Sequence, residues 1–144
     1  MRRAFLAGLA ALLPLAARAQ APTPRQTVLD FYDLVFRQKR VAEGFARHVG
    51  PTYTQHNPRV PDGAEAAIRF LGGRFRDNPA ASSELKRVVA EGDLVVLHHH
   101  SRSGPEDRGA AIVDIFRVAN GRIVEHWDVI QPVPETAANT NTMF

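Results

Sequence analysis

The sequence predicts an α+β fold, because helical periodicity fills its first half and strand periodicity fills its second half. From Ser83 onward, short apolar runs alternate with clusters of turn residues, which is typical of strands. Helices followed by a series of strands indicate an α+β domain, and the short connections favour antiparallel pairing. The length of 144 residues suits one domain.

The N-terminal segment, residues 1–19, has the organisation of a signal peptide. Arg2-Arg3 is positively charged, residues 4–17 form an apolar run, and Ala17-Arg18-Ala19 is a small-residue cleavage site. The run is too short to span a bilayer. We therefore expect a periplasmic or secreted protein that begins near Gln20, uses the Sec or the twin-arginine route, and has no membrane role after signal removal.

Charge and cysteine content narrow the function class. Loss of Arg2, Arg3 and Arg18 with the signal peptide reduces the eighteen basic residues to fifteen, which balance fifteen acidic ones. A neutral chain without a basic stripe argues against nucleic acid as a partner. The sequence has no cysteine, which excludes thiol chemistry and cysteine metal sites and leaves stability to the apolar core.

Three helices are expected in the N-terminal half. The first covers residues 24–40, with Thr23 as N-cap, Pro24 at the first helical position and Gln26 completing a capping box. The second covers residues 41–48. The third begins after Asp62, which forms a second capping box with Glu65 and leads into another amphipathic run.

Four strands are expected in the C-terminal half, over residues 84–90, 93–102, 109–118 and 122–131. Residues 53–58, between the second and third helices, are interpreted as irregular. Residues 135–144 show no periodicity. The expected organisation is therefore a signal peptide (1–19), one domain (20–134) and a C-terminal tail (135–144).

Three consecutive histidines end the second predicted strand. Side chains alternate across a strand, so His98 and His100 share a face with Leu94 and Val96, whereas His99 shares the other face with Leu97. Either all three imidazoles lie in solvent at the end of the strand, or His98 and His100 line a cavity walled by the helices.

Asp114 lies in the middle of the apolar run Ala110-Ala111-Ile112-Val113-Asp114-Ile115-Phe116. A buried carboxylate requires hydrogen bonds or a nearby cation, and imidazole offers both. Asp114 is either a structural residue that caps a loop or a carboxyl group in a partly dry pocket. In the second case, burial would raise its pKa and suit it to proton transfer near neutral pH.

The turn before the last strand leaves two alternatives for the side chains of that strand that share a face with Asp114. A two-residue turn at Asn120-Gly121 would place Glu125 and Trp127 on the face of Asp114. A three-residue loop that includes Ala119 would instead place His126 and Asp128 there, because a slip of one residue reverses every side chain.

Three segments together resemble the SnoaL-like polyketide cyclase family of the nuclear transport factor 2-like superfamily, which includes ketosteroid isomerase. They are Tyr53-Thr-Gln-His-Asn-Pro58, Glu91-Gly-Asp93 and Asp114-Ile-Phe-Arg-Val-Ala-Asn-Gly-Arg-Ile-Val-Glu-His-Trp-Asp128. The resemblance implies a cone-shaped, curved antiparallel sheet packed on N-terminal helices and enclosing one pocket. It also implies a homodimer, with Trp127 on the outer face.

The same resemblance implies roles for several residues. Asp114 corresponds to the general base of an aldol closure, and His100 to a histidine fourteen residues earlier that assists it. His98 would also face the pocket, and His99 would not. The isomerase register favours His126 and Asp128 as pocket residues.

Our leading hypothesis is an acid/base lyase or isomerase that acts on a small, partly apolar carbonyl compound. Asp114 would remove a proton next to the carbonyl group, His100 and His98 would stabilise the enolate, and Tyr53, His56 and Phe116 would orient the ligand. A non-catalytic ligand-binding or dimerising scaffold is the alternative.

A metal site is the third hypothesis. His98 and His100, two residues apart on a strand, would combine with Asp114 and His126 to form a zinc or iron site. The family does not generally use a metal, and we expect neither a metal nor another cofactor.

Overall fold

The computed structural model of the protein describes residues 21–144, and the predicted signal peptide lies outside them. Its elements in chain order are α1 (Pro24–Tyr32), a π-helical turn η1 (Asp33–Arg37), α2 (Val41–His48), β1 (Val49–Gln55), α3 (Ala64–Asp77), β2 (Ser82–Glu91), β3 (Leu94–Arg102), β4 (Ala110–Ala119) and β5 (Arg122–Pro132). Within residues 21–144, every helix is too short or too polar to span a bilayer.

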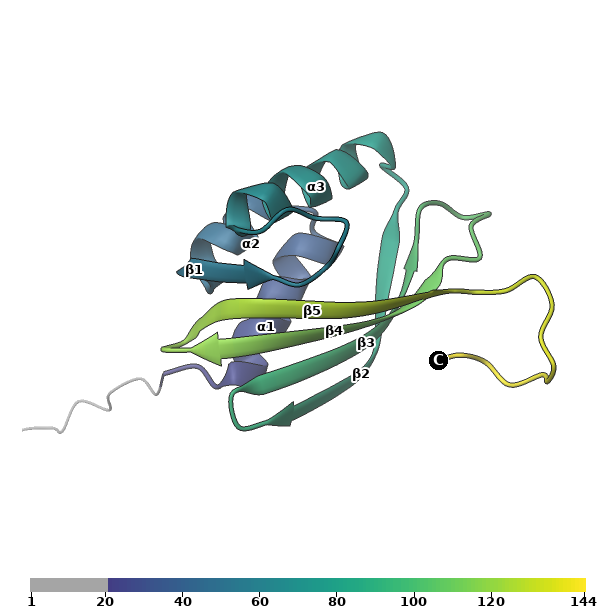
Figure 1. The fold of residues 1–144 in the computed structure, drawn as a ribbon. Helices are drawn as coiled ribbons and strands as arrows, with labels where there is room; N and C mark the ends of the chain where they lie inside the picture. Colours follow the sequence, from purple (N-terminus) through teal and green to yellow (C-terminus); the bar gives the residue numbers. More distant parts are fainter. Residues whose placement is uncertain (1–20) are drawn as a thin grey trace, which may run out of the picture.

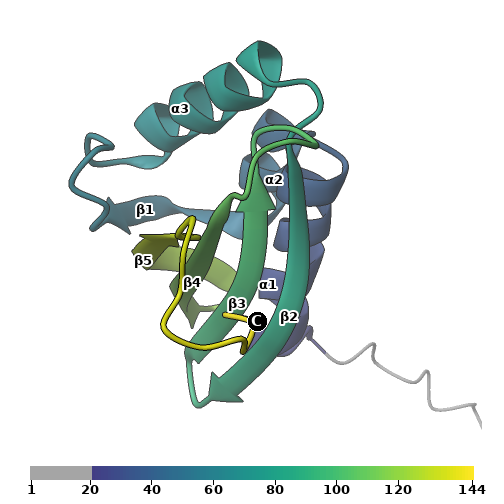
Figure 2. The same cartoon turned by 90° about the vertical axis from the view of Figure 1, so that its right-hand side faces the viewer.

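The strands form one curved sheet in the order β1-β5-β4-β3-β2, and the helices lie on its concave side (Figures 1 and 2). The predicted α+β cone is confirmed. The sheet is mixed rather than wholly antiparallel, because β1 pairs with β5 in parallel. The strands β2 to β5 pair antiparallel in chain order, as expected from their short turns.

Helix α1 begins where the sequence predicts. The Thr23 hydroxyl accepts a hydrogen bond from the backbone N–H of Gln26 at 3.2 Å, and Pro24 occupies the first turn. The Gln26 side chain does not complete a capping box, since it donates to Asp30 at 2.8 Å. The helix is shorter than predicted: η1 widens its end, and Lys39 has a positive φ of 57° that stops it.

The start of α3 differs from the prediction. Gly63, not Asp62, is the residue that precedes the first helical turn, and it makes no side-chain cap. The Asp62 carboxylate instead accepts from the backbone N–H groups of Gln55 at 2.8 Å and Gly63 at 2.9 Å. Asp62 therefore ties the end of β1 to the entry of α3.

Strand β1 was missed by the sequence analysis, which interpreted residues 53–58 as irregular. Gly50-Pro51 is a turn signal, yet Pro51 is tolerated because β1 lies at the edge of the sheet. Its partner β5 is the last strand in the sequence. The pairing continues to the hydrogen bond from the His56 N–H to the His126 carbonyl group at 2.9 Å. No local pattern in the sequence signals such a pairing.

The β4–β5 connection combines the two alternatives left open by the sequence. Asn120 and Gly121 form a two-residue turn with φ values of 51° and 73°. A bulge then changes the register: Val118 pairs with Ile123, whereas Phe116 pairs with His126. The extra residue places His126 and Asp128, not Glu125 and Trp127, on the face of Asp114.

Candidate functional site

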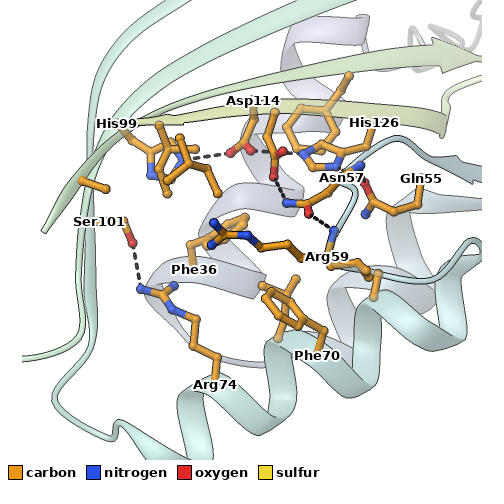
Figure 3. A pocket seen from close by; sticks show the side chains of 18 of the residues that line it. Phe36, Gln55, Asn57, Arg59, Phe70, Arg74, His99, Ser101, Asp114 and His126 are labelled. Carbon is orange, nitrogen blue, oxygen red and sulfur yellow. Dashed lines mark hydrogen bonds and ion pairs between the residues drawn. The ribbon is translucent and has the colours of Figure 1, made fainter. Parts of the chain in front are cut away.

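A cavity of about 420 Å³ lies between the helices and the concave face of the sheet (Figure 3). Aromatic side chains supply much of its apolar wall, namely those of Phe31, Phe36, Phe45, Tyr53, Phe70 and Phe116. Phe31 packs edge-on against both Phe45 and Phe116, with ring centroids 5.2 and 5.7 Å away. A volume of this size suits a small organic ligand.

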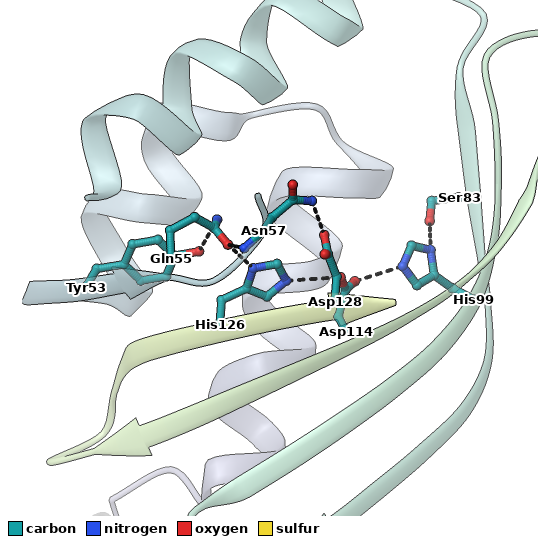
Figure 4. A network of polar contacts seen from close by, with 8 residues as sticks. All are labelled: Tyr53, Gln55, Asn57, Ser83, His99, Asp114, His126 and Asp128. Carbon is teal, nitrogen blue, oxygen red and sulfur yellow. Dashed lines mark hydrogen bonds and ion pairs between the residues drawn. The ribbon is translucent and has the colours of Figure 1, made fainter. Parts of the chain in front are cut away.

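Asp114 is the central polar residue of this pocket. It projects from the middle of β4 and is only 4% exposed. Its Oδ2 lies 2.8 Å from Nε2 of His99, and its Oδ1 lies 3.1 Å from Nε2 of His126 (Figure 4). The two imidazoles supply the partners that a buried carboxylate requires.

The expected rise in the pKa of Asp114 is wrong. Burial does raise this pKa, but the hydrogen bonds and charges of His126 and His99 outweigh it and hold the pKa well below its usual value. Asp114 is therefore ionised at neutral pH as long as both imidazoles contact it.

His126 bridges Gln55 and Asp114. The backbone N–H of Asn57 donates to Oε1 of Gln55 at 2.9 Å, so this atom is an acceptor. Nδ1 of His126 lies 2.9 Å from the same oxygen and is therefore placed to donate to it. Nε2 of the same ring faces Oδ1 of Asp114 at 3.1 Å, so the two side chains are placed to pass a proton between them.

A chain of two hydroxyl groups at Nδ1 favours one tautomer of His99. Its Nδ1 lies 2.6 Å from the Ser83 hydroxyl, which lies 2.7 Å from the Tyr32 hydroxyl. Burial raises the pKa of Tyr32 to about 12, so its hydroxyl group stays protonated. The tautomer of His99 with a proton on Nε2 satisfies this chain: Tyr32 donates to Ser83, Ser83 donates to Nδ1, and Nε2–H donates to Asp114.

Asp128 lies directly opposite Asp114 in the β4–β5 ladder. Two carboxylates at such a position repel each other. His126, two residues before Asp128 in β5, lies on the same face of the sheet. The side-chain amide of Asn57 donates to Asp128 at 2.6 Å. Tyr53 also lines the pocket and accepts from Gln55 at 3.2 Å, and burial raises its pKa above the usual value.

The assignment of His98 and His100 to the pocket is wrong, and so is the exclusion of His99. The β3–β4 register places Leu97 opposite Asp114, so the alternate residues His99 and Ser101 face the pocket. The loop between the strands sets this register, and a shift of one residue would have reversed it. His99, opposite Ile112, is a diagonal neighbour of Asp114 on the same face.

His98 and His100 lie on the outer face of the sheet. His98 contacts the Arg87 guanidinium at 3.0 Å, and His100 contacts the Arg108 carbonyl group at 2.8 Å. The C-terminal tail, expected to be featureless, folds back so that the Phe144 ring stacks on His100 at 4.1 Å. This contact helps to bury His100 without bringing it near Asp114.

His56 also lies outside the pocket, contrary to its predicted ligand-binding role. Its ring stacks on Trp127 at 4.7 Å, and its Nε2 contacts Glu125 at 2.9 Å. Both partners lie on the outer face of β5, because the bulge turns His126 and Asp128 inward. Phe116, His126 and Asp128 do line the cavity.

Several pocket residues were not anticipated. Gln55 and Asn57 enter through β1, whose long-range pairing has no local signal, and Arg59 follows from the same segment. Arg74 enters from α3, and His99 from the face of β3 that was assigned elsewhere. The sequence offered no signal for His99, because each face of that strand carries one leucine and one valine.

The donor set able to approach a metal ion differs from the one predicted. Ligand atoms of Asp114, His126 and Asp128 lie within 4.8 Å of one another, whereas His98 and His100 are on the opposite face. Both Asp114 oxygens already accept from imidazoles, and Asp128 accepts from Asn57. The residues are thus hydrogen-bonded to one another, and a metal would have to displace the His126 contact.

Comparison with known proteins agrees with this geometry. A profile of the SnoaL-like domain matches residues 28–126. IdmH, a candidate polyketide cyclase from Streptomyces antibioticus, is 21% identical, with a TM-score of 0.62 over 76% of this chain and 92% of that one. AclR, a candidate hydroxylase from Streptomyces galilaeus, is 20% identical, with a TM-score of 0.62 over 75% of this chain and 88% of that one.

A third similar structure is a nuclear transport factor 2-like protein of unknown function from Cytophaga hutchinsonii. It is 15% identical, with a TM-score of 0.64 over 80% of this chain and 96% of that one. At these identities the similarity concerns the fold. No curated protein sequence matches the chain.

The curved sheet, the helices on its concave side and the enclosed pocket give the chain the cone-shaped fold of the nuclear transport factor 2-like protein described above. The chain belongs to the SnoaL-like domain family, whose profile covers more than half of its residues.

Proposed function

We propose that the protein binds a small, partly apolar carbonyl compound and catalyses aldol-type or isomerase chemistry by proton transfer at the carbon next to the carbonyl group. The observation that carries the proposal is the Asp114–His126 pair, in which an imidazole nitrogen lies 3.1 Å from a carboxylate oxygen at the wall of a largely aromatic pocket. A paired base and acid in a pocket that excludes much of the water is the arrangement such chemistry requires.

In the proposed reaction, the substrate carbonyl oxygen accepts a hydrogen bond from Nε2–H of His126. This competes with the contact to Asp114, so the carboxylate loses a stabilising partner and becomes more basic. Asp114 then removes a proton from the adjacent carbon, and the electron pair of that C–H bond forms the enolate, whose oxygen His126 stabilises.

The enolate has two possible fates. In an aldol closure, its carbon attacks a second carbonyl group of the same molecule, and the resulting alkoxide takes the proton back from Asp114. In an isomerisation, Asp114 returns the proton to a different carbon. Both routes leave the Asp114–His126 pair with its original proton, so no cofactor is consumed.

His99 is a positioning residue in this scheme. Its Nε2–H donates to the second oxygen of Asp114, at 2.8 Å, and Ser83 fixes its ring from the other side. The oxygen that contacts His126 is therefore held toward the pocket while the other remains bonded. The enolate-stabilising role expected of His100 passes to His126.

The test is deuterium exchange at the carbon next to the carbonyl group of 4-phenyl-2-butanone in D₂O, followed by proton NMR. The native protein should accelerate exchange over buffer, and Asp114→Asn should remove the acceleration. His98→Ala is the matched control and should behave as the native protein does. Exchange that is unchanged in Asp114→Asn would sink the mechanism, whereas saturable binding without exchange would favour a non-catalytic scaffold.

We also propose that the chain is exported and that its mature form begins at Gln20. The organisation of residues 1–19 supports this. Expression of the full chain in a bacterial host, followed by fractionation and N-terminal sequencing, should find Gln20 as the first residue of periplasmic protein. An intact Met1 on protein confined to the cytoplasm would contradict the proposal.

A further inference from the structure

The pocket carries two arginines in addition to its acid/base groups. Arg59 enters from the loop after β1, and Arg74 enters from α3, and Figure 3 shows both side chains directed into the pocket. Arg59 is exposed and therefore marks a part of the pocket that solvent reaches. Its backbone N–H donates to Asn57 at 2.8 Å, which ties the loop that carries it to the polar network.

Neither guanidinium forms an ion pair within residues 21–144, unlike Arg69 on the same helix α3, which pairs with Glu65 at 2.6 Å. Arg74 donates through Nη2 to the Ser101 hydroxyl at 2.8 Å and to the Arg102 carbonyl group at 3.5 Å. These contacts leave Nε and Nη1 without a partner in the described part of the chain. Burial lowers the pKa of Arg74, and the negative charge of Asp107 offsets this only in part.

Asp107 lies on the pocket wall and its charge acts on Arg74, but it forms no ion pair with either guanidinium within residues 21–144, and its carboxylate oxygens have other partners. They accept from the backbone N–H groups of Ser103 at 2.7 Å and Gly109 at 2.8 Å, within the β3–β4 loop. Asp114 and Asp128 are likewise bonded to imidazole and amide donors. The positive charge of Arg59 and Arg74 is thus available to a ligand.

We infer that the pocket takes an organic anion: a carbonyl compound with an apolar body and a carboxylate group that Arg59 and Arg74 bind. A guanidinium matches a carboxylate with two parallel N–H donors, and such charge-assisted bonds are about twice as strong as neutral ones. The aromatic wall accommodates the apolar body, and the reactive carbonyl group reaches His126 and Asp114. This inference rests on the proposed function, because it assigns a substrate class to the same pocket.

The experiment is isothermal titration calorimetry of the native protein at pH 8 with 4-phenylbutanoate and with its neutral isostere 4-phenylbutanamide. The acid should bind at least about tenfold more tightly than the amide. Arg59→Gln and Arg74→Gln should each reduce this preference, and the double variant should bind the two probes equally. Arg69→Gln, on the exposed side of α3, is the matched control and should keep the full preference.

Arg59 is exposed, so Arg59→Gln should fold normally, and its thermal transition checks this. Equal binding of acid and amide by the native protein, no saturable binding of the acid up to its solubility limit, or a preference that survives the double substitution would overturn the inference. Asp114→Asn separates it from the proposed function: this variant should keep the acid preference while it loses deuterium exchange. If Asp114→Asn loses exchange but keeps the acid preference, the anion site is supported independently of the reaction. If the native protein catalyses exchange but shows no acid preference, the acid/base proposal stands and the anion site is rejected.

Discussion

His126 links Asp114 to Gln55, because one imidazole nitrogen lies 3.1 Å from the Asp114 carboxylate and the other lies 2.9 Å from Oε1 of Gln55. The orientation of Gln55 is in turn determined by the backbone N–H of Asn57. The position of the His126 imidazole therefore depends on β1, which pairs with β5 although the two strands are far apart in the sequence. Long-range pairing thus positions the imidazole that contacts Asp114.

The neighbouring residues His98 and His99 should differ sharply in their contribution to stability. His99→Ala leaves Asp114 and Ser83 without a buried partner and opens a cavity, so we expect a loss of about 2–4 kcal/mol in the free energy of unfolding. His98→Ala removes a half-buried outer-face side chain and should cost less than about 1 kcal/mol. Urea unfolding of both variants measures the difference. Equal losses would mean that the β3 register is different.

The contribution of Asp114 to stability should disappear in acid. Its pKa in the folded protein lies below the value of about 3.8 expected of the unfolded chain, because the imidazoles stabilise the charged form. The unfolded state therefore binds the proton more readily, so the stabilisation is complete above about pH 5 and falls as the pH drops below about 4.

This pH dependence is measured by the difference in unfolding free energy between the native protein and Asp114→Asn, from urea titrations at several pH values. The difference should shrink toward low pH. A difference that grows on acidification would show that burial, rather than the imidazole contacts, dominates the pKa.

Gly109 should be intolerant of a side chain. It has a φ of +76°, and a Cβ atom there would lie 2.2 Å from the carbonyl oxygen of Ser101. Gly109→Ala should therefore cost more than about 2 kcal/mol, from backbone strain and from displacement of the β3–β4 pairing. Gly104→Ala in the same loop meets no atom within 4 Å and should change stability by less than about 1 kcal/mol. Chemical denaturation compares the two, and a tolerated Gly109→Ala would contradict the close approach.

The mature chain, residues 20–144, should be a metal-free homodimer in native mass spectrometry. Val89 and Val129, 62% and 64% exposed, offer apolar surface on β2 and β5. Val129→Asp should weaken the dimer, since it places a charge on the outer face. The contact of His126 with Asp114 and the hydrogen bond from Asn57 to Asp128 occupy the groups that would bind a cation. A bound divalent metal or a monomer at micromolar concentration would contradict this prediction.

The sequence by itself determined the elements whose signals are local. Thr23-Pro24 starts α1, and apolar periodicity marks α2 and the four C-terminal strands. A carboxylate within an apolar strand also identified Asp114 as a residue that needs partners. These inferences depend only on neighbours in the chain.

The tertiary structure alone decided which side chains meet Asp114. Strand residues alternate with a period of two, so one residue more or less in a loop or bulge exchanges the two faces. The β3–β4 register selects His99 over His98 and His100, and the bulge within β5 selects His126 over Glu125. The parallel pairing of β1 then brings in Gln55 and Asn57 from a distant part of the chain. Each of these choices is made by contacts between strands, which sequence periodicity does not encode.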